Sequence, residues 1–292
     1  MTTNTNPARC RLTSVYLREL ATTLPGRYTA VLPHLERVPM LTGAQLDRLL
    51  ATTATDRQTT ARVRRRIMAR LGRLGLVATL DRRVGGARAG SAGHVYTLTT
   101  GGHRFLAISR NQPPPGRVRR SRAPGVMFLD HTLAISDLYV DLVCASRTTE
   151  VTVRQFATEP DCWHPTTSGG WLRPDAYTVL AANAYADCWW LEIDRATEPL
   201  PRIRTMCHAY LDHATSGGTG PDQVLPRVLI TTPDQRRADA IDTGVLTRLR
   251  ADATHPDTGL ITAVTHHEAA EFLITELHTH NPQSDAQTHH FG

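Results

Sequence analysis

Residues 57–74 carry the most regular alternation of apolar and polar positions in the first third of the chain. Four apolar residues recur there at i, i+4, i+8 and i+11, and these are Val63, Ile67, Leu71 and Leu74. This spacing predicts a helix with one buried stripe, whose other faces carry arginines. Gly75 follows directly and suits the end of the helix, because glycine readily adopts the left-handed backbone often found there.

Shorter patterns predict two helices ahead of this one, over residues 29–38 and 43–51. Pro33 is tolerated because it falls in the first turn of its helix. Thr42 is a good N-cap for the second helix, since its hydroxyl can accept a hydrogen bond from a backbone N–H of the first turn. The first third of the chain therefore begins with three helices in succession.

A β-hairpin is predicted after the third helix. Residues 76–84 and 94–100 alternate enough to be strands, and the segment between them, GGARAGSAG, is rich in glycine. A short helix over 101–108 closes the region. Three helices followed by a hairpin is the arrangement of a winged helix-turn-helix, in which helix 57–74 would be the recognition helix.

The formal net charge of +6 conceals two halves of opposite sign. Residues 1–123 hold 22 Arg and 5 acidic residues, whereas residues 124–292 hold 11 Arg and 22 acidic residues, and the chain has no lysine. A strongly cationic half attracts a polyanion, and binding releases the polyanion's condensed counterions. We therefore expect double-stranded DNA to be the partner of the first half.

The residues expected to contact DNA lie on the third helix and in the hairpin. They are Arg57, Gln58, Thr59, Thr60, Arg62, Arg65, Arg66, Arg70, Arg82, Arg83 and Arg88. The first residues of the helix would reach base edges in the major groove, and the hairpin arginines would touch phosphates or the minor groove. Arg64 and Arg73 are the arginines of this helix that we most readily assign to a solvated face instead.

Composition divides the chain into five segments. Residues 109–125 contain four prolines and several arginines, which is typical of an extended, semi-rigid linker. The expected order is an N-terminal arm (1–25), the winged helix-turn-helix (26–108), this linker (109–125), an acidic domain (126–280) and a disordered tail (281–292).

The acidic half predicts a second domain of mixed α and β structure. Residues 127–146 form a helical pattern with an apolar side of Phe128, Leu129, Ile135, Leu138 and Leu142. The remaining elements are three strands (150–156, 171–180, 187–194), a helix (199–213), a strand (227–232), a helix (234–250), a strand (260–264) and a final helix (266–278). The fold class expected of the whole chain is α+β or α/β.

Three acids mark candidate chemistry in this half. Asp175 lies on the second strand, and Glu192 and Asp194 alternate on the third strand, so these two share a face. Acids that converge from adjacent strands suit a hard divalent cation. The expectation is a catalytic set of Asp175, Glu192 and Asp194, with Asp175 and Glu192 as ligands of Mg²⁺ or Mn²⁺. We interpret His131, on the preceding helix, as a satisfied polar residue rather than as a metal ligand.

The sequence R-P-D-A, followed by E-x-D on the next strand, resembles the PD-(D/E)xK nuclease core. The resemblance implies an αβββαβ restriction-endonuclease-like domain. The family pattern places Lys where this chain has Asp194, which puts catalysis in doubt. Arg195 is expected to point to the opposite face of the strand, so Arg154 or Arg173 on neighbouring strands would have to supply the missing charge, and arginine is a poor base.

The chain as a whole resembles the actinobacterial replication-relaxation family of plasmids and mobile elements. The blocks that carry this resemblance are LTGAQLDRLL, RVGGARAGSAGHVYTLT, HTLAISDLYV, LRPDAY and LEIDRATEP. The resemblance implies a role in replication, maintenance or DNA relaxation of such an element, with a second domain that is nuclease-like and catalytically inactive or active.

Two alternative functions stay open at this stage, a metal-dependent nickase or endonuclease and a dimeric winged-helix transcriptional regulator. The expected partners beyond DNA are a second copy of the chain or other replication proteins. No apolar run reaches the length of a membrane span and no signal peptide is evident, so we expect no membrane association and a cytoplasmic location. The five scattered cysteines argue against a disulfide framework.

Overall fold

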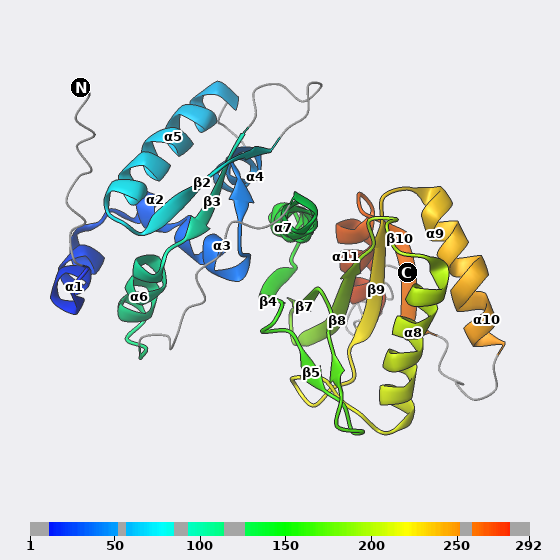
Figure 1. Ribbon diagram of the computed structural model, residues 1–292. Coiled ribbons are helices and arrows are strands. Elements are labelled where there is room, and N and C mark those ends of the chain that lie inside the picture. Colours follow the sequence, from blue (N-terminus) through cyan, green and yellow to red (C-terminus); the bar gives the residue numbers. More distant parts are fainter. Residues whose placement is uncertain (1–11, 52–56, 85–92, 114–125, 252–258, 281–292) are drawn as a thin grey trace, which may run out of the picture. The chain divides into compact units, whose positions relative to one another are not determined.

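The chain divides into two units, Met1–Val126 and Met127–Gly292. The computed structural model describes residues 12–51, 57–84, 93–113, 126–251 and 259–280 of them. Most of the expected linker and the whole of the expected tail lie outside the described residues. The structure is of mixed α+β class, as expected (Figure 1).

The first unit contains helices and a small antiparallel sheet. Its elements are α1 (Ser14–Thr23), α2 (Gly26–Thr29), α3 (Leu32–Arg37), β1 (Leu41–Thr42), α4 (Gly43–Leu50), α5 (Arg57–Arg73), β2 (Val77–Val84), β3 (Gly93–Leu98) and α6 (Thr100–Ser109). The sheet order is β1-β3-β2. The predicted helices are confirmed, and so are the two predicted strands, which pair antiparallel, whereas the glycine-rich segment between them lies outside the described residues. α1 was expected to be part of an arm.

Local sequence explains how α4 and α5 begin and end. The Thr42 hydroxyl accepts a hydrogen bond from the Gln45 N–H at 3.2 Å, and the Gln45 side chain accepts one from the Thr42 N–H at 2.7 Å. This capping box satisfies two backbone donors at the start of α4. Gly75, just beyond α5, has a φ of 71°, which a residue with a Cβ rarely adopts.

An ion pair connects α4 to α5. The Arg64 Nε donates to the Asp47 Oδ1 at 2.8 Å, and the Arg64 guanidinium lies so close to Gly43 that a Cβ there would collide with it. The Arg64 side chain is only 14% exposed, so its expected place on a solvated face is wrong. The pair holds the start of α4 against the middle of α5.

The second unit is a five-stranded sheet with helices on both faces. Its elements are α7 (Val126–Ser146), β4 (Thr152–Thr158), β5 (His164–Pro165), β6 (Trp171–Leu172), β7 (Ala176–Ala182), β8 (Tyr185–Ile193), α8 (Leu200–Thr215), β9 (Arg227–Thr232), α9 (Gln235–Ile241), a π-helical segment (Asp242–Leu246), α10 (Thr247–Arg250), β10 (Ile261–Thr265) and α11 (Ala269–Thr279). The sheet order is β10-β9-β8-β7-β4.

Strand direction changes at β8, in the middle of the sheet. β4, β7 and β8 pair antiparallel, whereas β8, β9 and β10 pair parallel. The order of the main elements from α7 to β9 is therefore αβββαβ, as predicted from the pattern. Because β8 and β9 are parallel, their carboxyl ends meet at one edge, where β7 begins.

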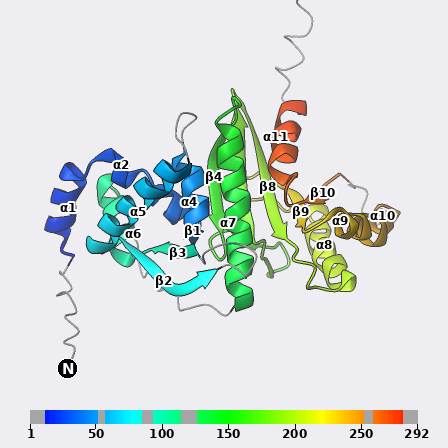
Figure 2. The same ribbon diagram turned by 90° about the horizontal axis from the view of Figure 1, so that it is seen from above.

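The two faces of this sheet have separate cores. Tyr177, Trp190 and Val228 are fully buried beneath α8 and the helical segments after β9. On the other face Tyr139 of α7 packs against Phe156, with ring centroids 5.0 Å apart. Figures 1 and 2 show the strands between these two groups of helices.

Three predicted burial assignments are wrong. Val63 is 46% exposed and Phe128 is 53% exposed, although both were placed in apolar stripes. Thr60, expected to contact DNA, is buried. Helical spacing locates the centre of an apolar face but does not tell which residues at its border are covered. Among the described helices, none combines the length and apolar character that a membrane crossing requires.

Candidate functional site

Asp175 is fixed at the point where β7 begins. Its backbone N–H donates to the Leu191 carbonyl at 3.0 Å, and its Oδ2 accepts a hydrogen bond from the Ile193 N–H at 2.7 Å. Both bonds link Asp175 to the carboxyl end of β8. The carboxylate is therefore oriented by the sheet itself rather than by a loop.

His131 and Glu159 adjoin the other side of this carboxylate. The His131 Nε2 lies 2.9 Å from the Asp175 Oδ1, and His131 comes from α7, 44 residues earlier in the chain. Glu159 directly follows β4, and its N–H donates to the Asp175 carbonyl at 3.3 Å. One donor atom from each of the three side chains lies within 4.8 Å of the others.

The pKa values of two of these groups, His131 and Glu159, are both raised. The hydrogen bond to Asp175 raises the pKa of His131, although burial opposes this shift. Burial, together with the nearby Asp175, raises the pKa of Glu159. Raised pKa values are the expected response of an imidazole and a carboxyl group that lie close to another carboxylate.

Glu192 accepts a hydrogen bond from a residue of α8. The Tyr210 hydroxyl donates to the Glu192 Oε1 at 2.5 Å. Burial first, and Asp175 second, raise the pKa of Glu192 well above its ordinary range. Glu192 and Asp175 thus influence one another electrostatically, as expected for acids that converge from adjacent strands.

Asp194 forms a buried ion pair with α9. Its Oδ2 accepts from the Arg237 Nε at 2.6 Å and its Oδ1 from the Arg237 Nη2 at 3.2 Å. The same guanidinium donates to the Glu198 carbonyl at 2.6 Å. The residue at the position of the missing lysine therefore anchors the segment between β8 and α8.

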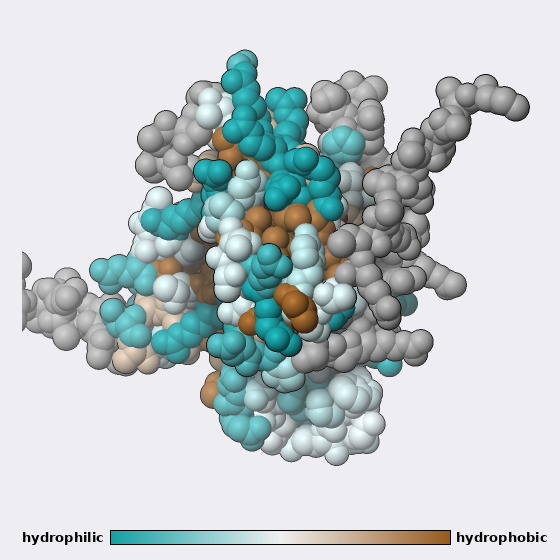
Figure 3. Space-filling model, turned by 90° about the vertical axis from the view of Figure 1, so that its left-hand side faces the viewer, coloured by the Kyte–Doolittle hydropathy of each residue, from teal (hydrophilic) through white to brown (hydrophobic). Residues whose placement is uncertain are grey.

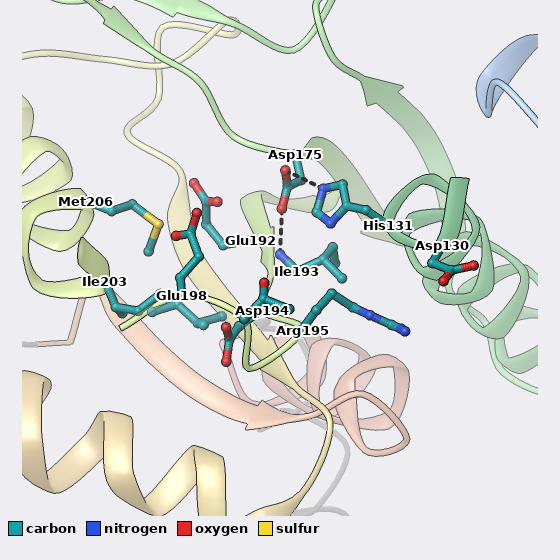
Figure 4. Close-up of a pocket in the computed structure, with 12 residues that line it drawn as sticks. Asp130, His131, Asp175, Glu192, Ile193, Asp194, Arg195, Glu198, Ile203 and Met206 are labelled. Carbon is teal, nitrogen blue, oxygen red and sulfur yellow. Dashed lines mark hydrogen bonds and ion pairs between the residues drawn. The ribbon is translucent and has the colours of Figure 1, made fainter. Parts of the chain in front are cut away.

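His131, Asp175, Glu192 and Asp194 line a cavity of about 450 Å³, and Glu159 is not among its lining residues. Figure 4 shows the carboxylates of Asp175, Glu192 and Glu198 facing a common space, with His131 beside Asp175. Arg195 also lines the cavity, but it extends away from Glu192 (Figure 4). Of the other cations considered, Arg173 lies over the Trp163 ring at 4.9 Å, and neither Arg173 nor Arg154 lines the cavity.

A separate candidate site is the arginine-rich surface of α5 in the first unit. Arg62, Arg65, Arg66 and Arg70 are all exposed. No ion pair to an acidic side chain is found for these four within the described part of the chain. On the face that Figure 3 presents, hydrophilic side chains surround smaller apolar patches. Unlike Arg64 of the same helix, these four arginines therefore form no ion pair with an acidic side chain among the described residues.

The remaining residues that we expected to contact DNA differ in exposure, and several of them lie outside the described part. Gln58 and Thr59 are exposed at the start of α5, and Thr60 is buried there. The side chains of Arg57, Arg82 and Arg83 lie outside the described part, and so does the whole of Arg88.

Sequence reasoning missed the partners of the acids. Arg237 was assigned no role, and His131 was expected to be a satisfied polar residue. The available signal was the alternation of β8, which turns Glu192 toward the helices that follow. Which residues of those helices lie opposite depends on packing across 18 residues for Tyr210 and 43 for Arg237.

Comparison with known proteins found one family. The family model described as replication-relaxation matches residues 32–228, which is more than half of the chain. The matched region runs from α3 to the beginning of β9, so it includes α5 and the three acids. No curated protein and no solved structure matches the chain.

Proposed function

The chain belongs to the replication-relaxation family, and we propose that it binds duplex DNA of a plasmid or mobile element through α5. The observation that carries this proposal is the row of exposed arginines on α5 without acidic partners among the described residues. A cationic helix surface gains free energy from a polyanion because counterions are released from it. The charge of α5 therefore indicates DNA as the partner, and the family indicates a plasmid or mobile element as the biological setting.

The order of elements in the first unit supports a winged helix-turn-helix. α3, α4 and α5 precede the β2–β3 hairpin, and β1 adds a third strand to it. In that arrangement the second helix of the turn enters the major groove and the hairpin contacts the backbone. We assign α5 as the recognition helix, with Arg57, Arg82, Arg83 and Arg88 as additional predicted contacts.

Salt-dependent DNA binding tests this proposal. The double variant Arg62→Ala/Arg66→Ala should bind duplex DNA more weakly, and the slope of log affinity against log salt should fall by about one for each arginine removed. The matched control is Arg204→Ala/Arg236→Ala, which removes two exposed arginines of the second unit. Binding that is independent of salt, or equal losses in both double variants, would contradict the proposal.

A second candidate function is metal-dependent cleavage of a phosphodiester in the acidic cavity. It is favoured by the donor set of His131, Glu159 and Asp175, whose atoms lie within 4.8 Å of one another. Two carboxylates and one imidazole fit Mn²⁺ better than Mg²⁺, which prefers oxygen ligands alone. Glu192, the expected second ligand, is held by Tyr210 and would have to release that bond to join them.

The residues present fit a cation, but they depart from the nuclease pattern. A bound divalent cation would supply Lewis-acid stabilisation of negative charge on a phosphate group. Asp175, Glu159 and the neutral imidazole of His131 would hold it, and Arg195 is the cavity's exposed guanidinium. The αβββαβ order of the second unit supports a PD-(D/E)xK-like domain, while the Asp194–Arg237 pair occupies the place of its lysine.

A nicking assay distinguishes the two functions. Supercoiled plasmid is incubated with the protein and Mn²⁺ or Mg²⁺, and nicked product is measured. Asp175→Ala should abolish nicking, whereas Asp239→Ala, at an exposed position on α9, should not change it. Equal product from wild type and Asp175→Ala would exclude catalysis in the cavity and leave DNA binding as the function.

A further inference from the structure

Val63 lies in the exposed face of α5 instead of in its buried stripe. Its side chain is 46% exposed, whereas Ile67 and Leu71, one and two turns further along, are 3% and 0% exposed. Within the described part of the first unit, Val15 and Val63 are the exposed large apolar residues. The exposed valine places apolar surface within a helix that is otherwise rich in charge.

Val63 shares a helix face with residues expected to meet DNA. Thr59, Val63, Arg66 and Arg70 follow one another at i, i+4, i+7 and i+11, which aligns them along one side of a helix. All four are exposed. The two methyl groups of Val63 are therefore presented among the same side chains that would face a duplex.

Resting on the proposed binding of a duplex by α5, we infer that Val63 recognises thymine through the C5-methyl group in the major groove. Thymine is the base that presents a methyl group there, and apolar side chains contact it. Arginines that bind phosphates fix the position of the helix but carry no sequence information. Val63 is stiff, since it is branched at Cβ, so little side-chain entropy is lost when it packs against the methyl group.

The test compares thymine with deoxyuridine, which differs only by lacking that methyl group. Preferred duplexes are first selected from random-sequence DNA with the full-length protein, and each thymine of the selected site is then replaced singly by deoxyuridine. At the contacted thymine, wild type should lose about fourfold in affinity, which corresponds to ~0.8 kcal/mol for one buried methyl group. Val63→Ala should bind the thymine and deoxyuridine duplexes equally well.

Val15→Ala is the matched control, because it shortens an equally apolar, exposed side chain on α1 and should keep the wild-type preference for thymine. Two outcomes overturn the inference while leaving DNA binding intact: wild type tolerates every single deoxyuridine, or Val63→Ala discriminates as well as wild type. A protein that binds no duplex at all contradicts the proposed function itself, so the two failures are distinguishable.

Discussion

At the scale of single residues, the Asp194–Arg237 pair has the clearest energetic consequence. The Asp194 side chain is 2% exposed and that of Arg237 is 16% exposed. Removing the arginine leaves a buried carboxylate without its counter-ion, which typically costs ~3–5 kcal/mol. We therefore expect Arg237→Ala to lower the free energy of unfolding of the second unit by that amount, as measured by urea denaturation.

A solvated ion pair provides the comparison for that measurement. The Arg250 and Asp242 side chains are 40% and 47% exposed, so water and salt screen their attraction. Arg250→Ala should cost less than about 1 kcal/mol. Equal losses for Arg237→Ala and Arg250→Ala would mean that burial of the Asp194–Arg237 pair does not govern its contribution.

Two histidines are expected to titrate on opposite sides of the ordinary value of about 6.5. The bond to Asp175 raises the pKa of His131, whereas burial, with Arg195 as the next cause, lowers the pKa of His266. For His266 the unfolded state binds more protons, so its contribution to stability is present above pH 6.5 and is lost as pH falls toward the folded-state value.

NMR titration of the ring signals in the presence of a chelator measures both pKa values directly. Asp175→Asn should lower the pKa of His131 and leave that of His266 unchanged, because Asp175 is not among the groups that shift His266. A pKa below 6.5 for His131 in wild type would show that the hydrogen bond to Asp175 is weaker than the burial that opposes it.

Which residues of the site were predictable follows from how far apart they are in sequence. Asp175, Glu192 and Asp194 were predicted together because strand alternation is local and adjacent strands bring such acids to one edge. His131 was not, since its approach to Asp175 depends on how α7 packs on the sheet. Arg237 was not predicted for the same reason, since its pairing with Asp194 depends on how α9 packs against the end of β8.

At the scale of elements, α4 offers a test of local sequence control. A threonine directly before an apolar repeat predicted the N-cap at Thr42, and the structure shows a capping box of Thr42 and Gln45 there. Thr42→Ala removes the acceptor for the Gln45 N–H and should cost ~0.5–2 kcal/mol in the stability of the first unit. Thr42→Ser retains a hydroxyl and should cost much less, and an equal loss for the two variants in denaturant unfolding would exclude capping as the cause.

Elements with strong internal periodicity were predictable, and those that depend on distant partners were not. α5, β2, β3 and α8 carry their own apolar repeats. α1 was taken for part of an arm because it buries only Leu17 and Leu20. It packs against α6, and Arg104 of α6 donates to the Leu12 carbonyl at 2.8 Å and the Ser14 hydroxyl at 3.1 Å. That anchor spans about ninety residues and leaves no local pattern.

At the scale of the whole molecule, the division into units coincides with the reversal of charge. Residues 124–126 are uncharged, so the unit ending at Val126 carries the 22 arginines and 5 acids counted for the first half. Each unit has buried apolar residues of its own, from Leu46 and Leu71 in one to Trp190 and Leu229 in the other. The boundary between the two units therefore coincides with the boundary between the basic and the acidic half of the chain.

This partition predicts how the two halves behave as separate fragments. Residues 1–126 should bind duplex DNA with the salt slope of the full chain, because the cations that release counterions all belong to that fragment. Residues 127–292 should fold but bind no duplex, since their 22 acids outnumber their 11 arginines. Circular dichroism establishes folding and fluorescence anisotropy at several salt concentrations measures binding. A reduced salt slope for the first fragment would mean that arginines of the second unit also contact the DNA.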